Sequence, residues 1–177
     1  LSQNEKDELL KEWDERVTEV TAAKKTLENV TEATPEEIKK AVNTIKKSWG
    51  KTKPTIKKGV GKLVNAKLGN VMVKIKQLQT KFDKIRDRLK EKGNDVTALD
   101  KYNVQLKTNL AEAEKNWKLA REKFAEAKTA SDVKKVIKEA HDYQKKSRDA
   151  IKKTRDDIRN IVKEIKKQNK PLKTKEN

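Results

Sequence analysis

Apolar residues recur three and four positions apart through most of the chain, and this periodicity restricts the fold more than any other feature of the sequence. The spacing is that of one face of an α-helix. No segment shows the strict alternation of apolar and polar residues that predicts a half-buried strand. Pro and Gly, which interrupt helices, are rare, with three and five residues among 177. The sequence therefore predicts an all-α protein.

Capping residues and helix breakers divide this pattern into about four to five helices. Thr34 and Glu37 have the spacing of a capping box, with a proline between them at the first helical position. Gly50 and Pro54 predict a break or a sharp kink at residues 50–53, and Gly93 predicts a helix end. Thr97 and Ser131 are expected to cap the last two helices. The predicted helices span residues 3–31, 35–49, 54–92, 97–128 and 131–167.

The expected architecture is an elongated antiparallel helical bundle with coiled-coil-like packing. The apolar rows keep a seven-residue repeat over four or more heptads, as in coiled coils. Short loops at 31–34, 93–96 and 128–131 force neighbouring helices to run antiparallel. We expect an N-terminal helical hairpin over residues 1–49 and a long three-helix bundle over residues 54–167. Residues 168–177 lack an apolar row and are expected to form a flexible basic tail.

The apolar rows also predict which side chains form the core. In the first segment the row consists of Leu10, Trp13, Val17, Val20 and Leu27, and in the second it consists of Ile38, Val42, Ile45 and Trp49. The rows of the last two helices carry four polar residues, Asn103, Gln144, Ser147 and Thr154, which we expect to help fix the register. All three tryptophans lie in such rows, so core packing is their expected role.

Charge is distributed unevenly along the chain. The formal net charge is +18, with 46 Lys and Arg against 28 Asp and Glu. Residues 38–82 contain thirteen Lys and no acidic residue, whereas residues 1–37 contain eleven acidic and five basic residues. The remaining charge is of mixed sign, which is typical of the solvated surface of helices. The basic excess is therefore a local property of one 45-residue stretch.

This stretch contains the candidate binding residues for a membrane or another polyanion. A basic amphipathic helix can lie at an anionic membrane interface, and lysines can bind nucleic-acid phosphates by displacing counterions. The stretch has no Arg, the residue that reads guanine bidentately, so sequence-specific DNA binding is not expected. The alternative is structural: the apolar face belongs to the core, and the acidic first helix neutralises the lysines. The candidates are Lys51, Lys53, Lys57, Lys58, Lys62, Lys67, Lys74 and Lys76.

Several functional classes are excluded or disfavoured by residues that the chain lacks. Without Cys there is neither a disulfide framework nor thiol chemistry, and the single histidine, His141, cannot form a histidine cluster. No apolar run approaches the roughly 18 residues of a membrane span. The carboxylates are spaced as helical ion-pair partners of Lys and Arg. We expect no enzyme activity, no cofactor and no metal.

The second half of the chain resembles predicted exported helical proteins of unknown function from candidate-phyla bacteria. The resemblance rests on the run from Phe82 to Asp100, FDKIRDRLKEKGNDVTALD, in which a helix ends in Leu-Lys-x-x-Gly-x-Asp before another charged helix. The later segments AEAE at 111–114 and IKEAHD at 137–142 fit the same pattern. The resemblance covers about residues 75–166, and the first 70 residues depart from it. It implies export and a non-enzymatic helical module, and it assigns no functional residues.

The sequence thus leads to one main functional hypothesis and two alternatives. The main hypothesis is a non-catalytic scaffold or binding module, secreted or in the cell envelope, that acts through its charged surface. The first alternative is a lysine-rich binder of anionic membranes or nucleic acid, and the second is a subunit of a filament or surface layer. The expected partners are anionic surfaces, partner helices or further copies of the chain, with no small-molecule substrate. A cytoplasmic location is the alternative to export.

Overall fold

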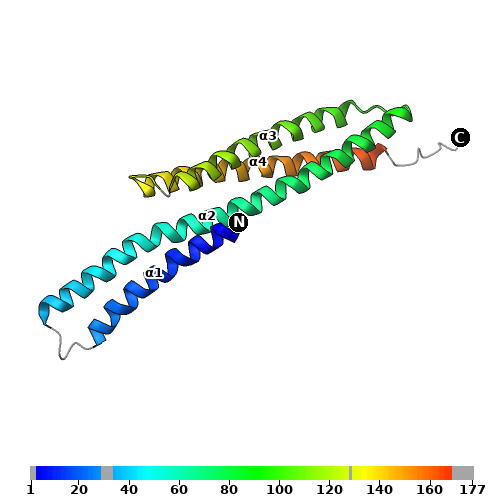
Figure 1. Ribbon diagram of the computed structural model, residues 1–177. Coiled ribbons are helices and arrows are strands. Elements are labelled where there is room, and N and C mark those ends of the chain that lie inside the picture. The colour runs from blue at the N-terminus through cyan, green and yellow to red at the C-terminus, as the bar shows by residue number, and fades with distance from the viewer. Residues whose placement is uncertain (1–2, 29–33, 128, 169–177) are drawn as a thin grey trace. The chain divides into compact units, whose positions relative to one another are not determined.

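The computed structural model describes residues 3–28, 34–127 and 129–168, and nearly all of them are helical (Figure 1). The helices are α1 (Gln3–Glu28), α2 (Pro35–Glu91), α3 (Thr97–Glu126) and α4 (Val133–Gln168). No strand occurs in the described ranges. The predicted all-α fold of packed antiparallel helices is confirmed. Most of the tail predicted at 168–177 lies outside the described residues.

Local capping chemistry explains where these helices begin and end. Thr34 and Glu37 form the predicted capping box: the Thr34 N–H donates to Glu37 Oε2 (2.8 Å) and the Glu37 N–H to Thr34 Oγ1 (3.3 Å). These hydrogen bonds from Thr34 lower the pKa of Glu37. At the other end of α2, Gly93 has a φ of +78°, and the N–H groups of Gly93 and Asn94 donate to the carbonyls of Lys90 and Leu89. This is a Schellman motif, as the glycine predicted.

The caps of α3 and α4 lie close to the predicted positions but use other residues. The Thr97 N–H donates to Asp95 Oδ1 (2.9 Å), so Asp95 rather than Thr97 supplies the side-chain acceptor. The Lys135 N–H donates to Asp132 Oδ1 (3.0 Å), so Asp132 takes the role expected of Ser131. In both cases a carboxylate is the acceptor, which also interacts favourably with the positive end of the helix dipole.

Of the two alternatives predicted for residues 50–53, a break or a sharp kink, the break does not occur, because α2 is one helix of 57 residues with Pro54 in its interior. Proline lacks the N–H that would bond to the carbonyl four residues earlier, which here belongs to Gly50. Gly50 is exposed, so water can take the place of the missing donor. The Thr52 hydroxyl additionally bonds to the Ser48 carbonyl at 2.8 Å. The predicted helices 35–49 and 54–92 are therefore parts of one element.

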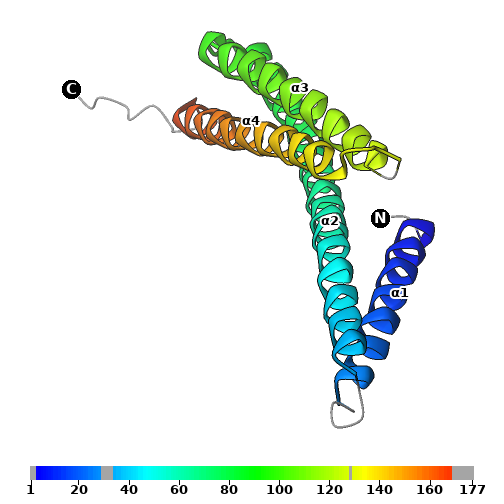
Figure 2. The ribbon, with the colours of Figure 1, turned by 90° about the vertical axis from the view of Figure 1, so that its left-hand side faces the viewer.

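Contacts divide the chain into two compact units that share α2. The hairpin unit comprises Leu1–Ala66 and Lys123–Ala140, and the bundle unit comprises Lys67–Glu122 and His141–Asn177. This division falls within α2 and differs from the expected boundary at residues 50–53. In the hairpin unit α1 lies beside the first part of α2, as both ribbon views show (Figures 1 and 2).

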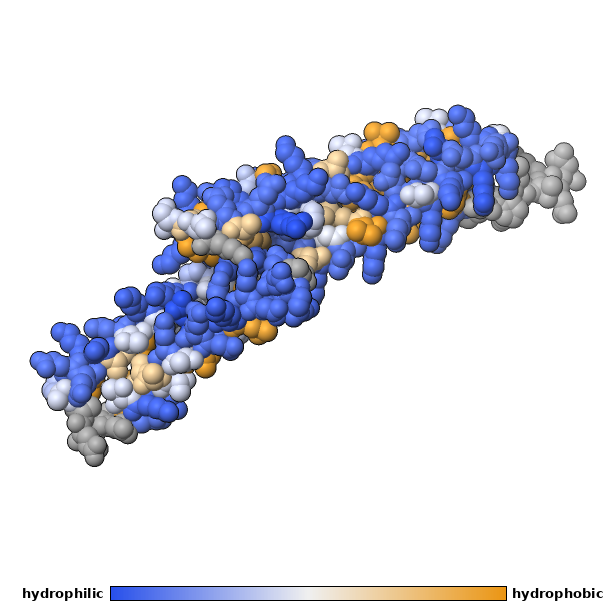
Figure 3. All heavy atoms as spheres, viewed as in Figure 1, coloured by the Kyte–Doolittle hydropathy of each residue, from blue (hydrophilic) through white to orange (hydrophobic). Residues whose placement is uncertain are grey.

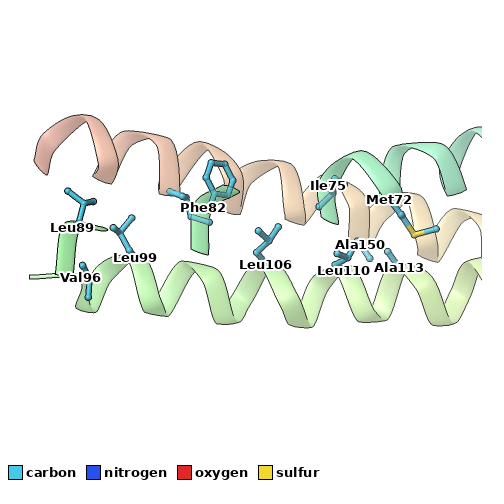
Figure 4. Close-up of a cluster of buried hydrophobic side chains, with 11 residues drawn as sticks. Met72, Ile75, Phe82, Leu89, Val96, Leu99, Leu106, Leu110, Ala113 and Ala150 are labelled. Carbon is cyan, nitrogen blue, oxygen red and sulfur yellow. The ribbon is translucent and has the colours of Figure 1, made fainter. Parts of the chain in front are cut away.

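The bundle unit contains the main hydrophobic core, which is formed by α2, α3 and α4 (Figure 4). Leu106 and Ala113 of α3 are completely buried in this core. Within the bundle unit, the predicted rows of α3 and α4 face this core, whereas Ala127 and Ile137 near the α3–α4 turn belong to a separate apolar cluster. Polar residues in the rows have partners: the Ser147 hydroxyl donates to the Ala113 carbonyl (2.8 Å), and the Asn103 amide donates to Asp83. The buried apolar residues are Met72, Ile75, Phe82, Leu89, Val96, Leu99, Leu106, Leu110, Ala113, Ala150 and Ile161.

A glycine allows close packing at one position of this core. A Cβ atom on Gly69 would lie 3.2 Å from Trp117 Cζ2 and 3.3 Å from Cε2. This distance is shorter than ordinary carbon–carbon contact. The indole therefore packs directly against the backbone of α2. Trp117 has the core role that its position in the apolar row predicted.

The hairpin unit is packed differently, and the core predicted for it is only partly correct: Ile38, Val42 and Ile45 of α2 are partly buried, but most of the predicted row of α1 is exposed. Trp13, Val17 and Trp49 are 48%, 61% and 64% exposed. The apolar row of α1 does not face α2; the row one position earlier does. This row includes Leu9, whose Cδ2 would lie 3.5 Å from a Cβ atom on Gly59 of α2. The predicted seven-residue repeat is present in α1, but two adjacent rows of this helix have it, so the repeat does not specify which row is buried. The row that faces α2 is Glu5, Leu9, Glu12, Arg16, Glu19 and Ala23.

Candidate functional site

Lysines of α2 and acidic residues of α1 meet in the interface between the two helices. Lys58 Nζ lies 2.8 Å from Glu12 Oε1 and 2.9 Å from Oε2, and its side chain is only 8% exposed. Lys62 Nζ lies 3.7 Å from Glu5 Oε1 and is also buried. A buried ammonium group needs such a partner, because desolvation without compensation is costly. Lys58 and Lys62 are therefore structural residues and are not available to an external ligand.

A third polar contact continues this interface toward the α1–α2 loop. The Ser48 hydroxyl donates to Glu19 Oε2, and Arg16 Nη1 donates to Glu19 Oε1 at 2.8 Å. The hydrogen bond from Ser48, followed by the one from Arg16, lowers the pKa of Glu19. The structural alternative for the lysine stretch is thus correct for two lysines. Its apolar side chains are divided: Val60 and Leu63 are exposed, whereas Met72, Ile75 and Phe82 lie in the core of the bundle unit.

The remaining six candidate lysines lie on the surface. Lys76 forms an ion pair with Glu114 of α3. Lys51 lies near Glu19, which it influences electrostatically, and it lines a cleft beside the α3–α4 turn. The other four are exposed and take part in no ion pair among the described residues. These four are Lys53, Lys57, Lys67 and Lys74.

Exposed basic residues on α2 form a row with a seven-residue repeat that the sequence analysis missed. In the hairpin unit the row is Lys39, Lys46 and Lys53; Val60 interrupts it; in the bundle unit it is Lys67, Lys74, Lys81 and Arg88. All seven basic residues are exposed, and none has an ion-pair partner within the described part of the chain. Four of them, Lys39, Lys46, Lys81 and Arg88, were not among the candidates. The sequence does contain a sign of them, because these basic residues recur every seven positions as the apolar residues do.

The bundle part of this row alternates with exposed apolar side chains. Val71 and Leu78 lie between the lysines at 67, 74 and 81, with spacings of three and four. One helical turn spans 3.6 residues, so these five residues share one face of α2. Figure 3 shows, in the visible face, apolar side chains in orange that reach a mainly hydrophilic surface. We call Lys67, Val71, Lys74, Leu78, Lys81 and Arg88 the basic face of the bundle unit.

The described residues contain no group of three or more His, Asp or Glu side chains placed to hold a metal ion. His141 is half-buried, with Nδ1 3.3 Å from Gln144 Oε1. None of the helices in the described ranges has an apolar stretch sufficient to cross a lipid bilayer. Comparison with known protein families, with curated proteins and with solved structures finds no match to this chain.

Proposed function

We propose that the protein is a non-catalytic helical binding module, secreted or in the cell envelope, that binds an anionic surface or polymer. The observation that carries the proposal is the basic face of the bundle unit. Its four basic side chains are exposed, and none of them forms an ion pair with a carboxylate of the described residues. The proposed location follows the resemblance to exported helical proteins.

The chemistry of this face suits a ligand with regularly distributed negative charge. Seven residues of an α-helix rise about 10.5 Å, so the four charges form a line of roughly 32 Å. Lysine presents a point charge without a fixed hydrogen-bonding geometry, and therefore favours charge density over a particular chemical group. Binding by such residues releases counterions and must weaken steeply as salt increases.

Among anionic ligands, the face favours a membrane surface over nucleic acid. Val71 and Leu78 are about 40% exposed between the lysines, with values of 41% and 38%. At a bilayer these side chains could enter the boundary between headgroups and acyl chains while the lysines contact the headgroups. Nucleic-acid phosphates would give Val71 and Leu78 no comparable apolar contact. The proposed ligand is therefore the headgroup region of an anionic membrane.

The test is binding of the full chain to vesicles with and without anionic lipid, and to duplex DNA, across a salt series. We expect binding to anionic vesicles only. It should weaken steeply between about 50 and 200 mM salt, because each lysine near the surface contributes about 1 kcal/mol that salt screens. The triple variant K67E/K74E/K81E should abolish binding. The control K101E/K115E/K118E makes the same change in net charge at exposed positions of α3 and should bind more strongly than the first variant.

Three results would overturn the proposal. They are binding that is indifferent to salt, equal loss in both triple variants, and binding to zwitterionic vesicles as strong as to anionic ones. Binding to DNA but not to vesicles would retain the polyanion function and reject the membrane.

A further inference from the structure

The hairpin unit carries an apolar surface that none of its own described residues covers. On α1 this surface consists of Leu10, Trp13, Val17 and Val20, and on α2 its most exposed members are Trp49, Val60 and Leu63, all between 36% and 64% exposed. Ile56 is partly buried in the same row of α2. We call these eight residues the apolar face of the hairpin. Each row has the seven-residue repeat of a coiled-coil seam.

Helix geometry places both rows on the same side of the hairpin. Successive residues of an α-helix are turned by about 100°, and each apolar row lies one position after the residues through which α1 and α2 touch, so each row is about 100° from the line of contact, in the same sense of rotation. Because the two helices are antiparallel, the same sense of rotation leads to the same side. On the opposite side, Lys11 of α1 and Pro54 of α2 line a cleft together with Asp132 of the α3–α4 turn. The apolar face therefore lies away from that turn.

The outer edges of the apolar face carry opposite charges. Asp14 and Glu28 lie on α1 about half a turn from its contact line with α2, and Lys39 and Lys53 lie correspondingly on α2. All four side chains are exposed, and Glu28 also pairs with Lys24 at 3.1 Å within its own helix. One edge of the face is thus acidic and the other is basic.

These charges are also matched in height along the hairpin. The residue numbers of contacting pairs total 67 for Glu19 with Ser48 and for Glu5 with Lys62, 68 for Leu9 with Gly59 and 70 for Glu12 with Lys58, so residues at about the same level have numbers that total about 68. Asp14 is accordingly level with Lys53, and Glu28 with Lys39. Within one hairpin these side chains point away from each other on opposite edges. If a second copy is related to the first by a two-fold axis parallel to the helices, each residue of the second copy keeps the same height along the axis. The rotation also places α2 of the second copy next to α1 of the first. The acidic edge then meets the basic edge of that copy at the same height.

We propose that the apolar face of the hairpin binds the apolar face of a second copy, so that two hairpins form an antiparallel four-helix bundle. The predicted contacts at its edges are Asp14 with Lys53 of the second copy and Glu28 with Lys39 of the second copy. The face is about 39 Å long, from the 26 residues of α1, and about 20 Å wide for two packed helices. It would bury about 800 Å² on each copy, which is the size of a standard stable interface.

The acidic edge argues against a membrane as the occupant of this face. Anionic headgroups would repel Asp14 and Glu28 and attract the basic edge with Lys39 and Lys53, whereas a second copy offers each of these carboxylates a lysine and each lysine a carboxylate. The inference goes beyond the proposed function, because it uses the hairpin unit and not the basic face of the bundle unit. Each proposal can therefore fail without the other.

The first experiment is sedimentation or light scattering of the full chain at concentrations up to roughly 100 µM. An interface of this size has a dissociation constant in the micromolar range or below, so the dimer should form at that concentration. We expect a dimer. The variant V17K/L63K places ammonium groups in the apolar face and should raise the dissociation constant at least about 100-fold. Both positions are exposed in the single chain, so the fold should survive, which circular dichroism checks. The control V104K alters a side chain of the bundle unit that is 63% exposed and should remain dimeric.

The second experiment tests the register through the charges. D14K and K53D should each weaken the dimer about 10-fold, because each creates two like-charge contacts across the two-fold axis. The combined variant D14K/K53D should restore the affinity of the unaltered chain. A monomeric chain at the highest concentration, a dimer that survives V17K/L63K, or a combined variant no stronger than its parents would overturn the proposal. A monomer whose binding to anionic vesicles is abolished by V17K/L63K would overturn it in favour of a membrane.

Discussion

Replacing Gly50 with alanine tests the continuity of α2, the point at which the structure departs most from the sequence-based expectation. Gly50 lies inside α2, is exposed, and has no heavy atom within 4 Å of the position that a Cβ would take. The substitution therefore has no steric cost. Its effect should be the difference in helix propensity between glycine and alanine, about 1 kcal/mol in favour of alanine. A large part of this gain comes from the lower conformational entropy of the unfolded chain.

The assay is thermal unfolding followed by circular dichroism at 222 nm. For a chain of this length, a gain of 1 kcal/mol raises the Tm by about 2–4 °C, provided that the hairpin unit contributes to the observed transition. Gly93 is the matched control, because nothing lies within 4 Å of its Cβ position either, but its φ is +78°. Gly93→Ala should lower the Tm by a similar amount, since alanine is strained in that conformation. A loss of stability in Gly50→Ala would show that residue 50 is not helical and would refute the reasoning.

Two further perturbations test the interface between α1 and α2. Glu12→Ala leaves the buried ammonium group of Lys58 without a partner and should destabilise the hairpin unit by about 1–3 kcal/mol, less than for a fully buried pair because Glu12 is 37% exposed. Lys58→Met removes that ammonium group and should cost under about 1 kcal/mol. Urea unfolding measures both free energies, and equal losses would contradict a buried ammonium group. Hydrogen bonds from Ser48 and then Arg16 lower the pKa of Glu19, so the ionised carboxylate stabilises the folded state. This contribution is present at pH values above the ordinary carboxyl pKa and is lost as the pH falls through and below it. Urea midpoints measured as a function of pH should fall less steeply on acidification in Ser48→Ala, and identical profiles would argue against this contact.

Most of the secondary structure follows from local rules that the sequence states directly. The capping box at Thr34 and Glu37 and the glycine at position 93 depend only on residues a few positions apart. Pro54 was expected to interrupt the helix but lies inside α2. Helix propensity predicts the free-energy cost of a proline in a helix, but not whether the stability of the surrounding helix outweighs that cost. In this chain the cost is limited, since the unbonded carbonyl belongs to an exposed glycine.

The candidate site was predicted only in part, because charge along the sequence does not specify which neighbour each charge will meet. Lys58 and Lys67 have the same chemistry and lie in the same acid-free stretch, yet Lys58 is buried against Glu12 and Lys67 is exposed. Lys58 lies in the hairpin unit, where α1 brings the Glu12 carboxylate to it, whereas Lys67 belongs to the bundle unit and forms no ion pair among the described residues. Lys81 and Arg88 were missed although their seven-residue repeat is visible in the sequence.

The sequence by itself determined which segments are helical, most of the helix ends and the repeat of each apolar row, because hydrogen bonding within a helix and its 3.6-residue period are local properties. It did not determine the continuity of α2 at residues 50–53. In α3 and α4 it also determined the buried side, since each has one dominant apolar row. Only the tertiary structure decided how α1 packs. There the polar row with Glu5 and Glu12 faces α2, and the row with Trp13 does not. Periodicity states which residues share a face, but the partner helix decides which face is buried, and the lysines of α2 provide partners for carboxylates.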